Sequence, residues 1–104
     1  MDLIEMNFRK AKEQAAQLEE LAARLDNLAK KDIQETMQNL SGAWKGDSAD
    51  AYIQKGNRLE ENIVATAAKL KQIAATIRST AQRTYETEMR VREIARERTY
   101  GGGN

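Results

Sequence analysis

The sequence predicts an all-α protein, an antiparallel helix–turn–helix hairpin. The chain of 104 residues contains no proline, and residues with a high helix propensity dominate it. Apolar residues recur at spacings of three and four on both sides of the centre. The one strong helix break surrounds the single tryptophan. We therefore expect one small domain at 1–98, with helices at about 5–40 and 48–98, a turn at 41–47 and a flexible tail at 99–104.

The first predicted helix, 5–40, carries a wide apolar stripe. At 100° per residue the stripe covers about 140°, which is broader than a two-stranded coiled-coil seam requires. Such a stripe can touch two neighbours at once. Leucines occupy one side and small residues the adjoining side: Leu18, Leu21, Leu25 and Leu28, and Ala11, Ala15, Ala22 and Ala29. We expect the leucines to fill volume in the packing and the alanines to permit close approach.

The turn contains Trp44-Lys45-Gly46. We expect the indole of Trp44 to fill the gap between the helices, and Gly46 to adopt a backbone conformation that other residues avoid. Two interpretations of Trp44 stay open: a purely structural plug, or a plug that also serves as a recognition anchor. Gly46 is interpreted as structural.

The second predicted helix, 48–98, begins with Asp47 or Ser48 as a cap. One packing row recurs every seven residues, and a second row runs beside it: Gly56, Ile63, Leu70, Ile77, Thr84 and Val91; Tyr52, Leu59, Thr66, Ile73, Thr80, Thr87 and Ile94. Packing should be strongest from Leu59 to Ile77, because threonines replace the large aliphatic residues beyond it. We interpret Gly56 as space for Trp44 or for a crossing helix.

The unequal helix lengths predict self-association. If residue 83 lies opposite the start of the first helix, about fifteen residues project beyond it, roughly 22 Å. Tyr85, Met89, Val91 and Ile94 would then have nothing to pack against within one hairpin, and half of each stripe would face water. Pairing into a dimeric four-helix bundle covers both surfaces.

Composition argues against several function classes. The chain has no cysteine and no histidine, so we expect no catalytic residue, no cofactor and no metal site. Residues 1–50 carry 7 basic and 10 acidic side chains and residues 51–104 carry 10 and 6, a balance that suits two complementary helices better than a nucleic-acid footprint. We expect no nucleic-acid partner and no stable membrane insertion, because no apolar run approaches the length of a membrane span.

The central segment Leu40-Ser41-Gly42-Ala43-Trp44-Lys45-Gly46-Asp47-Ser48-Ala49-Asp50-Ala51-Tyr52, its position and its helical flanks resemble the WXG family of small type VII secretion proteins (the early-secreted-antigen-like, or ESAT-like, proteins). The resemblance covers residues 1 to about 98. It implies a helical hairpin that forms a homodimer, antiparallel in arrangement, or pairs with a homologous hairpin or effector domain. It also implies export by the membrane ATPase of a Gram-positive secretion system, without a cleaved signal peptide, and an association with virulence.

Family members often carry a tyrosine followed four residues later by an acidic residue. Here the fourth position after Tyr85 is Met89, and an acid stands at the third, Glu88. Offsets of three and four lie on the same helix face, so Tyr85 and Glu88 are the candidate secretion signal. A surface tyrosine beside an ordinary helical charge is the alternative.

We therefore expect a non-enzymatic protein that is secreted after synthesis in the cytoplasm, acting as an export substrate or as a partner for a larger effector. The alternatives are a cytosolic coiled-coil scaffold that is not exported and a membrane-active amphipathic protein.

Overall fold

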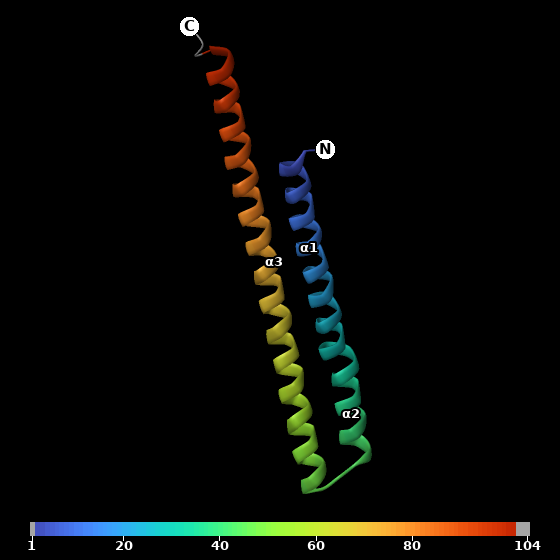
Figure 1. The fold of residues 1–104 in the computed structure, drawn as a ribbon. Coiled ribbons are helices and arrows are strands. Elements are labelled where there is room, and N and C mark those ends of the chain that lie inside the picture. Colours follow the sequence, from blue (N-terminus) through green and yellow to red (C-terminus); the bar gives the residue numbers. More distant parts are fainter. Residues whose placement is uncertain (1, 102–104) are drawn as a thin grey trace. The chain divides into compact units, whose positions relative to one another are not determined.

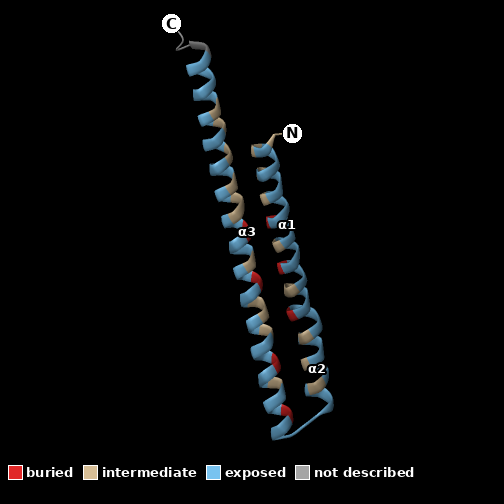
Figure 2. Ribbon diagram, in the orientation of Figure 1, coloured by how far each residue is buried: buried red, intermediate tan, exposed pale blue. Residues whose placement is uncertain are grey.

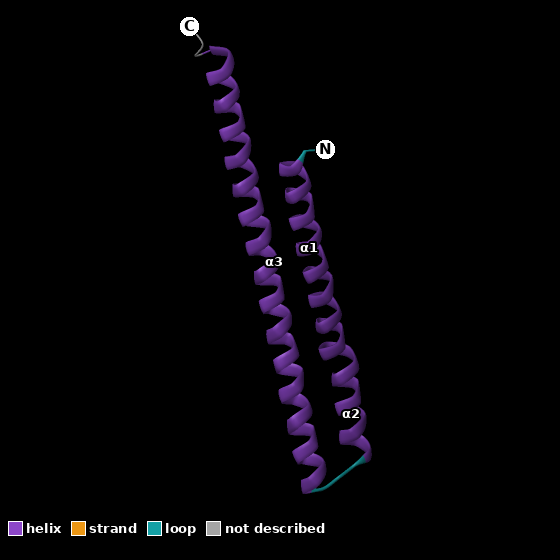
Figure 3. Ribbon diagram, viewed as in Figure 1, coloured by secondary structure: helices purple, strands orange, loops and turns teal. Residues whose placement is uncertain are grey.

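The computed structural model describes residues 2–101, with side chains described from 2 to 99. The chain forms α1 (Leu3–Asn27), the π-helix η1 (Leu28–Ile33), α2 (Gln34–Ala43) and α3 (Asp47–Gly101), and residues 2–101 contain no strand (Figures 1 and 3). The predicted all-α hairpin is confirmed. Of the tail predicted at 99–104, the part up to Gly101 continues α3, and 102–104 lie outside the described residues.

Tertiary contacts group the chain into two compact units. In residues 17–72, the end of α1, η1 and α2 lie antiparallel to the first half of α3. In the second unit, the described parts of 1–16 and 73–104, the start of α1 lies antiparallel to the second half of α3. The same pair of helical segments therefore builds both units.

The first helix begins with a side-chain cap that the sequence analysis did not anticipate. The Asp2 carboxylate accepts a hydrogen bond from the Glu5 backbone N–H at 2.9 Å, which satisfies one of the free amide groups of the first turn. Asp2 and Glu5 also place negative charge at the positive end of the helix dipole. The helix consequently starts at Leu3, two residues before the expected position.

η1 absorbs one extra residue in the heptad pattern of the first predicted helix. Phe8, Ala15, Ala22 and Ala29 recur every seven residues. Ala11, Leu18 and Leu25 form a second row with the same period. Continued at this interval, the two rows would reach polar residues, whereas the apolar residues stand one position later: Asp32, Thr36 and Asn39 against Ile33, Met37 and Leu40. A π-turn closes an i→i+5 hydrogen bond and so holds one residue more than an α-turn. It returns the apolar side chains to the face that packs on α3.

The connection comprises only residues 44–46. The Trp44 backbone is extended (φ −122°, ψ 124°), and its N–H closes the last turn of α2 on the Leu40 carbonyl at 2.8 Å. Gly46 has a φ of 112°, and its carbonyl accepts the first hydrogen bond of α3, from Asp50 N–H at 3.1 Å. Gly46 therefore takes the capping position that was expected of Asp47 or Ser48, both of which lie within the first turn of α3.

Among the described residues, the core consists of alanines. Six are buried to 1% exposure or less, and no large side chain is fully buried: Ala15, Ala22, Ala29, Ala49, Ala67 and Ala74 (Figure 2). Small side chains let the two helical segments of each unit approach closely. Gly56 extends this arrangement, because the Met37 side chain of α2 occupies the space that a Cβ at Gly56 would require. A crossing helix, and not Trp44, uses the room that Gly56 leaves.

The expectation that residue 83 faces the start of the first helix was wrong. Asp2 pairs with Arg92 at 2.8 Å, and the Phe8 ring stacks on Tyr85. The first helical segment runs on to Ala43, and the extended Trp44 separates the two helix ends, so the facing residues differ from those expected for a compact turn at 41–47. Tyr85 therefore has an intrachain partner, while Val91 and Ile94 stay exposed.

Candidate functional site

Trp44 and Gly46 lie together in the connection of the 17–72 unit. The Trp44 side chain is 39% exposed and packs against Tyr52 of α3, with ring centroids 5.4 Å apart and ring planes inclined by 46°. The indole was expected to fill the gap between the helices, and this expectation was wrong. The Lys55 ammonium lies 5.9 Å from the Tyr52 ring centroid, within the range of a cation–π contact. The turn therefore presents an exposed aromatic pair bordered by a cation.

Tyr85 is a half-buried residue of α3 in the other unit. Its ring stacks on Phe8 of α1, with centroids 4.5 Å apart and planes inclined by 24°. The Lys12 ammonium approaches the Phe8 ring, 4.5 Å from its centroid. The candidate signal tyrosine is therefore held against the first helix by an aromatic contact of the offset kind that such rings favour.

Tyr85 and Glu88 line the same groove. The groove has a volume of about 370 Å³, and its walls are apolar and hydroxyl-bearing side chains of α1 and α3, among them Ile4, Phe8, Ile77, Thr80 and Thr84. Glu88 is exposed, and it is the one charged residue in this lining. The offset of three residues thus brings the tyrosine and the carboxylate to one surface.

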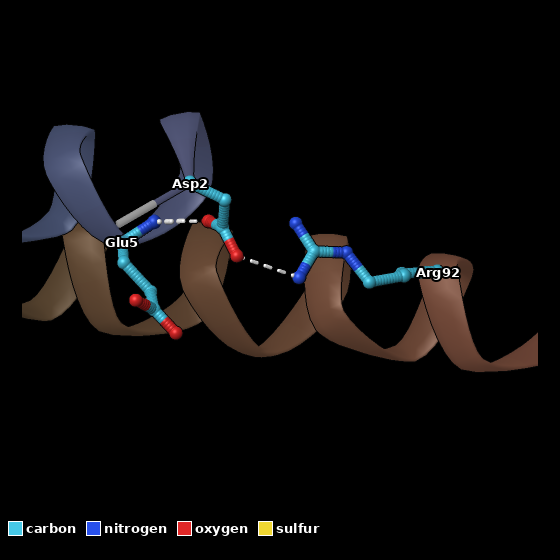
Figure 4. Close-up of polar contacts among 3 residues, drawn as sticks. All are labelled: Asp2, Glu5 and Arg92. Atoms are coloured by element: carbon cyan, nitrogen blue, oxygen red, sulfur yellow. Dashed lines mark hydrogen bonds and ion pairs between the residues drawn. The ribbon is translucent and has the colours of Figure 1, made fainter.

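An ion pair stands beside this groove at the start of α1. The Arg92 guanidinium donates to the Asp2 carboxylate at 2.8 Å, and the other carboxylate oxygen accepts the Glu5 N–H (Figure 4). The hydrogen bond from Arg92 holds the pKa of the Asp2 carboxyl below its ordinary value, with a further contribution from the Glu5 amide, and the same pair raises the pKa of Arg92.

A second ion pair joins α1 to α3 in the 17–72 unit. The Lys71 ammonium donates to the Asp26 carboxylate at 2.7 Å. This hydrogen bond lowers the pKa of the Asp26 carboxyl, and the charges of Lys71 and Lys30 lower it further. Both pairs join the two helical segments, and in each unit they show which residues of α1 and α3 face each other.

The nine residues expected to pack the hairpin and the dimer divide into two groups. Five are half-buried, and four keep between 41% and 52% of their surface exposed: Leu18, Leu25, Ile63, Leu70 and Ile77; Leu21, Leu28, Leu59 and Ile73. The alanines, and not the leucines, occupy the closest contacts. A row of large aliphatic side chains therefore stays open on each helical segment.

Sequence reasoning did not identify Phe8, Asp2 and Arg92 as parts of the site. The heptad row that contains Phe8, traced through Ala15 and Ala22, places Phe8 on the face that packs against the second helix but does not say that Tyr85 lies opposite. The ion pair had no comparable signal, because Arg92 is one of five arginines between Arg83 and Arg98.

Two further features bear on the chemistry available. Within residues 2–101, no three or more carboxylate side chains gather closely enough to hold a metal ion. No helix in this part of the chain combines the length and the apolar character that crossing a membrane requires.

One family model matches the sequence. It is WXG100, described as proteins of 100 residues with WXG, and it covers residues 3–89, a range that includes the Trp44-Lys45-Gly46 turn, Tyr85 and Glu88. Comparisons with curated proteins and with solved structures gave no match. Proteins of this family are non-enzymatic substrates of type VII secretion. On the matched range, its helical hairpin and its Trp-x-Gly turn, the chain belongs to the WXG100 family and is a small helical protein associated with type VII secretion.

Proposed function

We propose that the chain is an export substrate of a type VII secretion system and that it acts as an antiparallel homodimer, a four-helix bundle. The observation that carries the dimer is the composition of the intrachain contact. Each unit buries alanines, while Leu21, Leu28, Leu59 and Ile73 stay exposed. Because apolar surface gains free energy when it leaves water, a second helical hairpin is the natural cover for these rows.

We further propose that Tyr85 and Glu88 form the export signal read by the secretion ATPase. Their shared groove supports this, since it brings the ring and the carboxylate to one surface. In this proposal residues 1–98 work as one hairpin domain, and the protein leaves the cell without a cleaved signal peptide. Trp44 serves both the turn and recognition, because its exposed indole, paired with Tyr52, has the character of an interface anchor.

Export from cells that carry the secretion system tests this function. Tyr85→Ala and Glu88→Gln should reduce the protein in the culture supernatant about tenfold or more, with unchanged amounts inside the cells, because each removes one side of the signal. Glu97→Gln is the matched control, since its side chain is exposed and lies outside the groove. Wild-type export of Tyr85→Ala would contradict the proposed signal.

A role as partner of a larger effector is the second candidate. The acid at the third position after Tyr85, with Met89 at the fourth, favours it, because an effector that carries the four-residue spacing could supply the complete signal. Export measured with and without the other substrates of the secretion system separates the two roles. A self-sufficient substrate is exported in cells that lack the other substrates, whereas a partner is exported only when its effector is present. Retention in the cytoplasm in both conditions would instead indicate a cytosolic scaffold.

A further inference from the structure

The candidate signal tyrosine is covered by its own chain. Phe8 lies against Tyr85 at a ring separation of 4.5 Å, and Tyr85 is half-buried, whereas Glu88 is exposed. Seven residues beyond Tyr85, Arg92 is held by Asp2 at 2.8 Å. Two contacts from the first turns of α1 thus bracket this part of α3, and they leave Glu88 more accessible than Tyr85.

The covering segment is weakly secured. Leu3 is 69% exposed and Met6 is 51% exposed, so two large side chains of the first turns contribute little burial. The Asp2 carboxylate and the Arg92 guanidinium belong to side chains that are themselves partly exposed, 39% and 34%. Partly exposed ion pairs contribute little to stability, and terminal turns with few buried contacts open most easily.

We propose that the first two turns of α1 mask Tyr85, and that their opening controls whether the export machinery can bind the Tyr85–Glu88 pair. The inference rests on the proposed role of this pair as the signal. In the closed form the Phe8 ring occupies the face of Tyr85 that a partner would contact. When the turns open, the phenol ring, Glu88 and the freed Arg92 guanidinium become accessible together on α3.

Masking lowers the apparent affinity by the fraction of molecules that are open. Removing the aromatic contact should raise that fraction by about two- to tenfold, since this is the usual strength of such a pair. Asp2→Asn should act in the same direction but more weakly, because asparagine still caps the helix while the charge that holds Arg92 is lost.

The test compares wild type, Phe8→Ala and Asp2→Asn with the control Leu3→Ala, which removes an exposed apolar side chain of the same turns that does not line the groove. The first readout is the dissociation constant for the purified soluble ATPase domains of the secretion system. The second is the rate of tyrosine nitration by tetranitromethane, mapped by peptide. Tyr52, which is 59% exposed and lies in the other unit, serves as the internal reference.

We expect Phe8→Ala to bind the ATPase about two- to tenfold more tightly and to nitrate Tyr85 faster relative to Tyr52, with Leu3→Ala like wild type. If Phe8→Ala loses its helical circular dichroism, the test uses Asp2→Asn instead. That variant should show a smaller increase in ATPase affinity and in the relative nitration rate of Tyr85. Equal nitration of Tyr85 and Tyr52 in wild type, or weaker or unchanged binding by Phe8→Ala, would overturn the masking. Wild-type binding by Tyr85→Ala would instead overturn the proposed signal, so the two failures are distinguishable.

Discussion

Single residues decide how the chain turns. Gly46 has a φ of 112°, a value that residues with a side chain rarely adopt, and nothing surrounds the position where its Cβ would stand. A substitution there therefore introduces backbone strain and no clash. Gly42 stands four residues earlier, inside α2, and its Cβ position is equally open. The two glycines differ only in the backbone conformation that they require.

Gly46→Ala should lower the free energy of unfolding by about 1–2 kcal/mol, because alanine is strained at a positive φ. Gly42→Ala should leave it unchanged or raise it by up to about 1 kcal/mol, since alanine is favoured over glycine in a helix. Urea titrations followed by circular dichroism measure both. Equal losses in the two variants would show that the turn does not depend on the Gly46 conformation.

The two interhelical ion pairs predict a pH dependence of stability. Hydrogen bonds from Arg92 and Lys71 lower the pKa of Asp2 and Asp26 in the folded state. An unfolded aspartate titrates at about 4, so the folded state binds fewer protons near this pH. The stabilisation is present above this value and is lost as the pH falls through the folded-state pKa values.

The urea midpoint should therefore decrease between pH 6 and pH 3, and Asp2→Asn with Asp26→Asn should show a smaller decrease than wild type. The control pair is Asp32→Asn with Asp50→Asn, two exposed aspartates outside the two interhelical ion pairs. A decrease of the same size in the Asp2 and Asp26 double variant would contradict the contribution of these pairs.

At the scale of elements, the first helical segment shows how one inserted residue is accommodated. The apolar rows before Ala29 and after Asp32 differ by one position, and η1 spans this join. Removing one residue there restores an uninterrupted heptad pattern from Phe8 to Leu40. The π-turn therefore accommodates the extra residue, and without that residue the heptad pattern would not need it.

Deletion of Lys31 should convert η1 to an α-helix and leave the melting temperature unchanged or higher. Deletion of Lys10, an exposed lysine in regular helix, should lower it by roughly 5 °C or more, because it rotates Phe8 and Ile4 away from α3. Thermal circular dichroism compares the two deletions. A loss after the Lys31 deletion as large as after the Lys10 deletion would mean that the π-turn itself supports the fold.

Much of this element structure could be predicted from the sequence. The absence of proline, the three–four spacing and the break around Trp44 give the hairpin, because helix propensity and packing agree along the chain. The order of burial could not be predicted. The leucine and alanine sides of the stripe have the same periodicity, so the sequence does not say which side packs on α3. The alanines are buried because the two helices approach closely. Which residue of α3 lies opposite Phe8 depends on the length of the connection between the helices. The spacing of apolar residues does not give that length.

At the scale of the whole molecule, the candidate site follows from what the hairpin leaves uncovered. The Trp-x-Gly turn could be identified from the sequence because it matches a family pattern. Tyr85 and Glu88 were chosen as a candidate pair although their three-residue spacing departs from that pattern. The covering of Tyr85 by α1 could not be identified from the sequence. The exposed aliphatic rows predict that a second hairpin binds over them. A charged side chain introduced into one of these rows should therefore prevent dimer formation.

Leu59→Lys should abolish dimer formation, because it places a charge in the interface that Leu59, 52% exposed in one chain, is proposed to form. Gln54→Lys is the control, since Gln54 is an exposed polar residue of the same helix. Sedimentation velocity at micromolar concentration compares the two. A dimer of unchanged affinity in Leu59→Lys would exclude this row from the interface.

Light scattering during size-exclusion chromatography of the purified wild-type chain, with circular dichroism of the same fraction, tests the central claim most directly. The exposed leucine rows predict a helical species of twice the mass of one chain. A helical species with the mass of one chain at every concentration would contradict it.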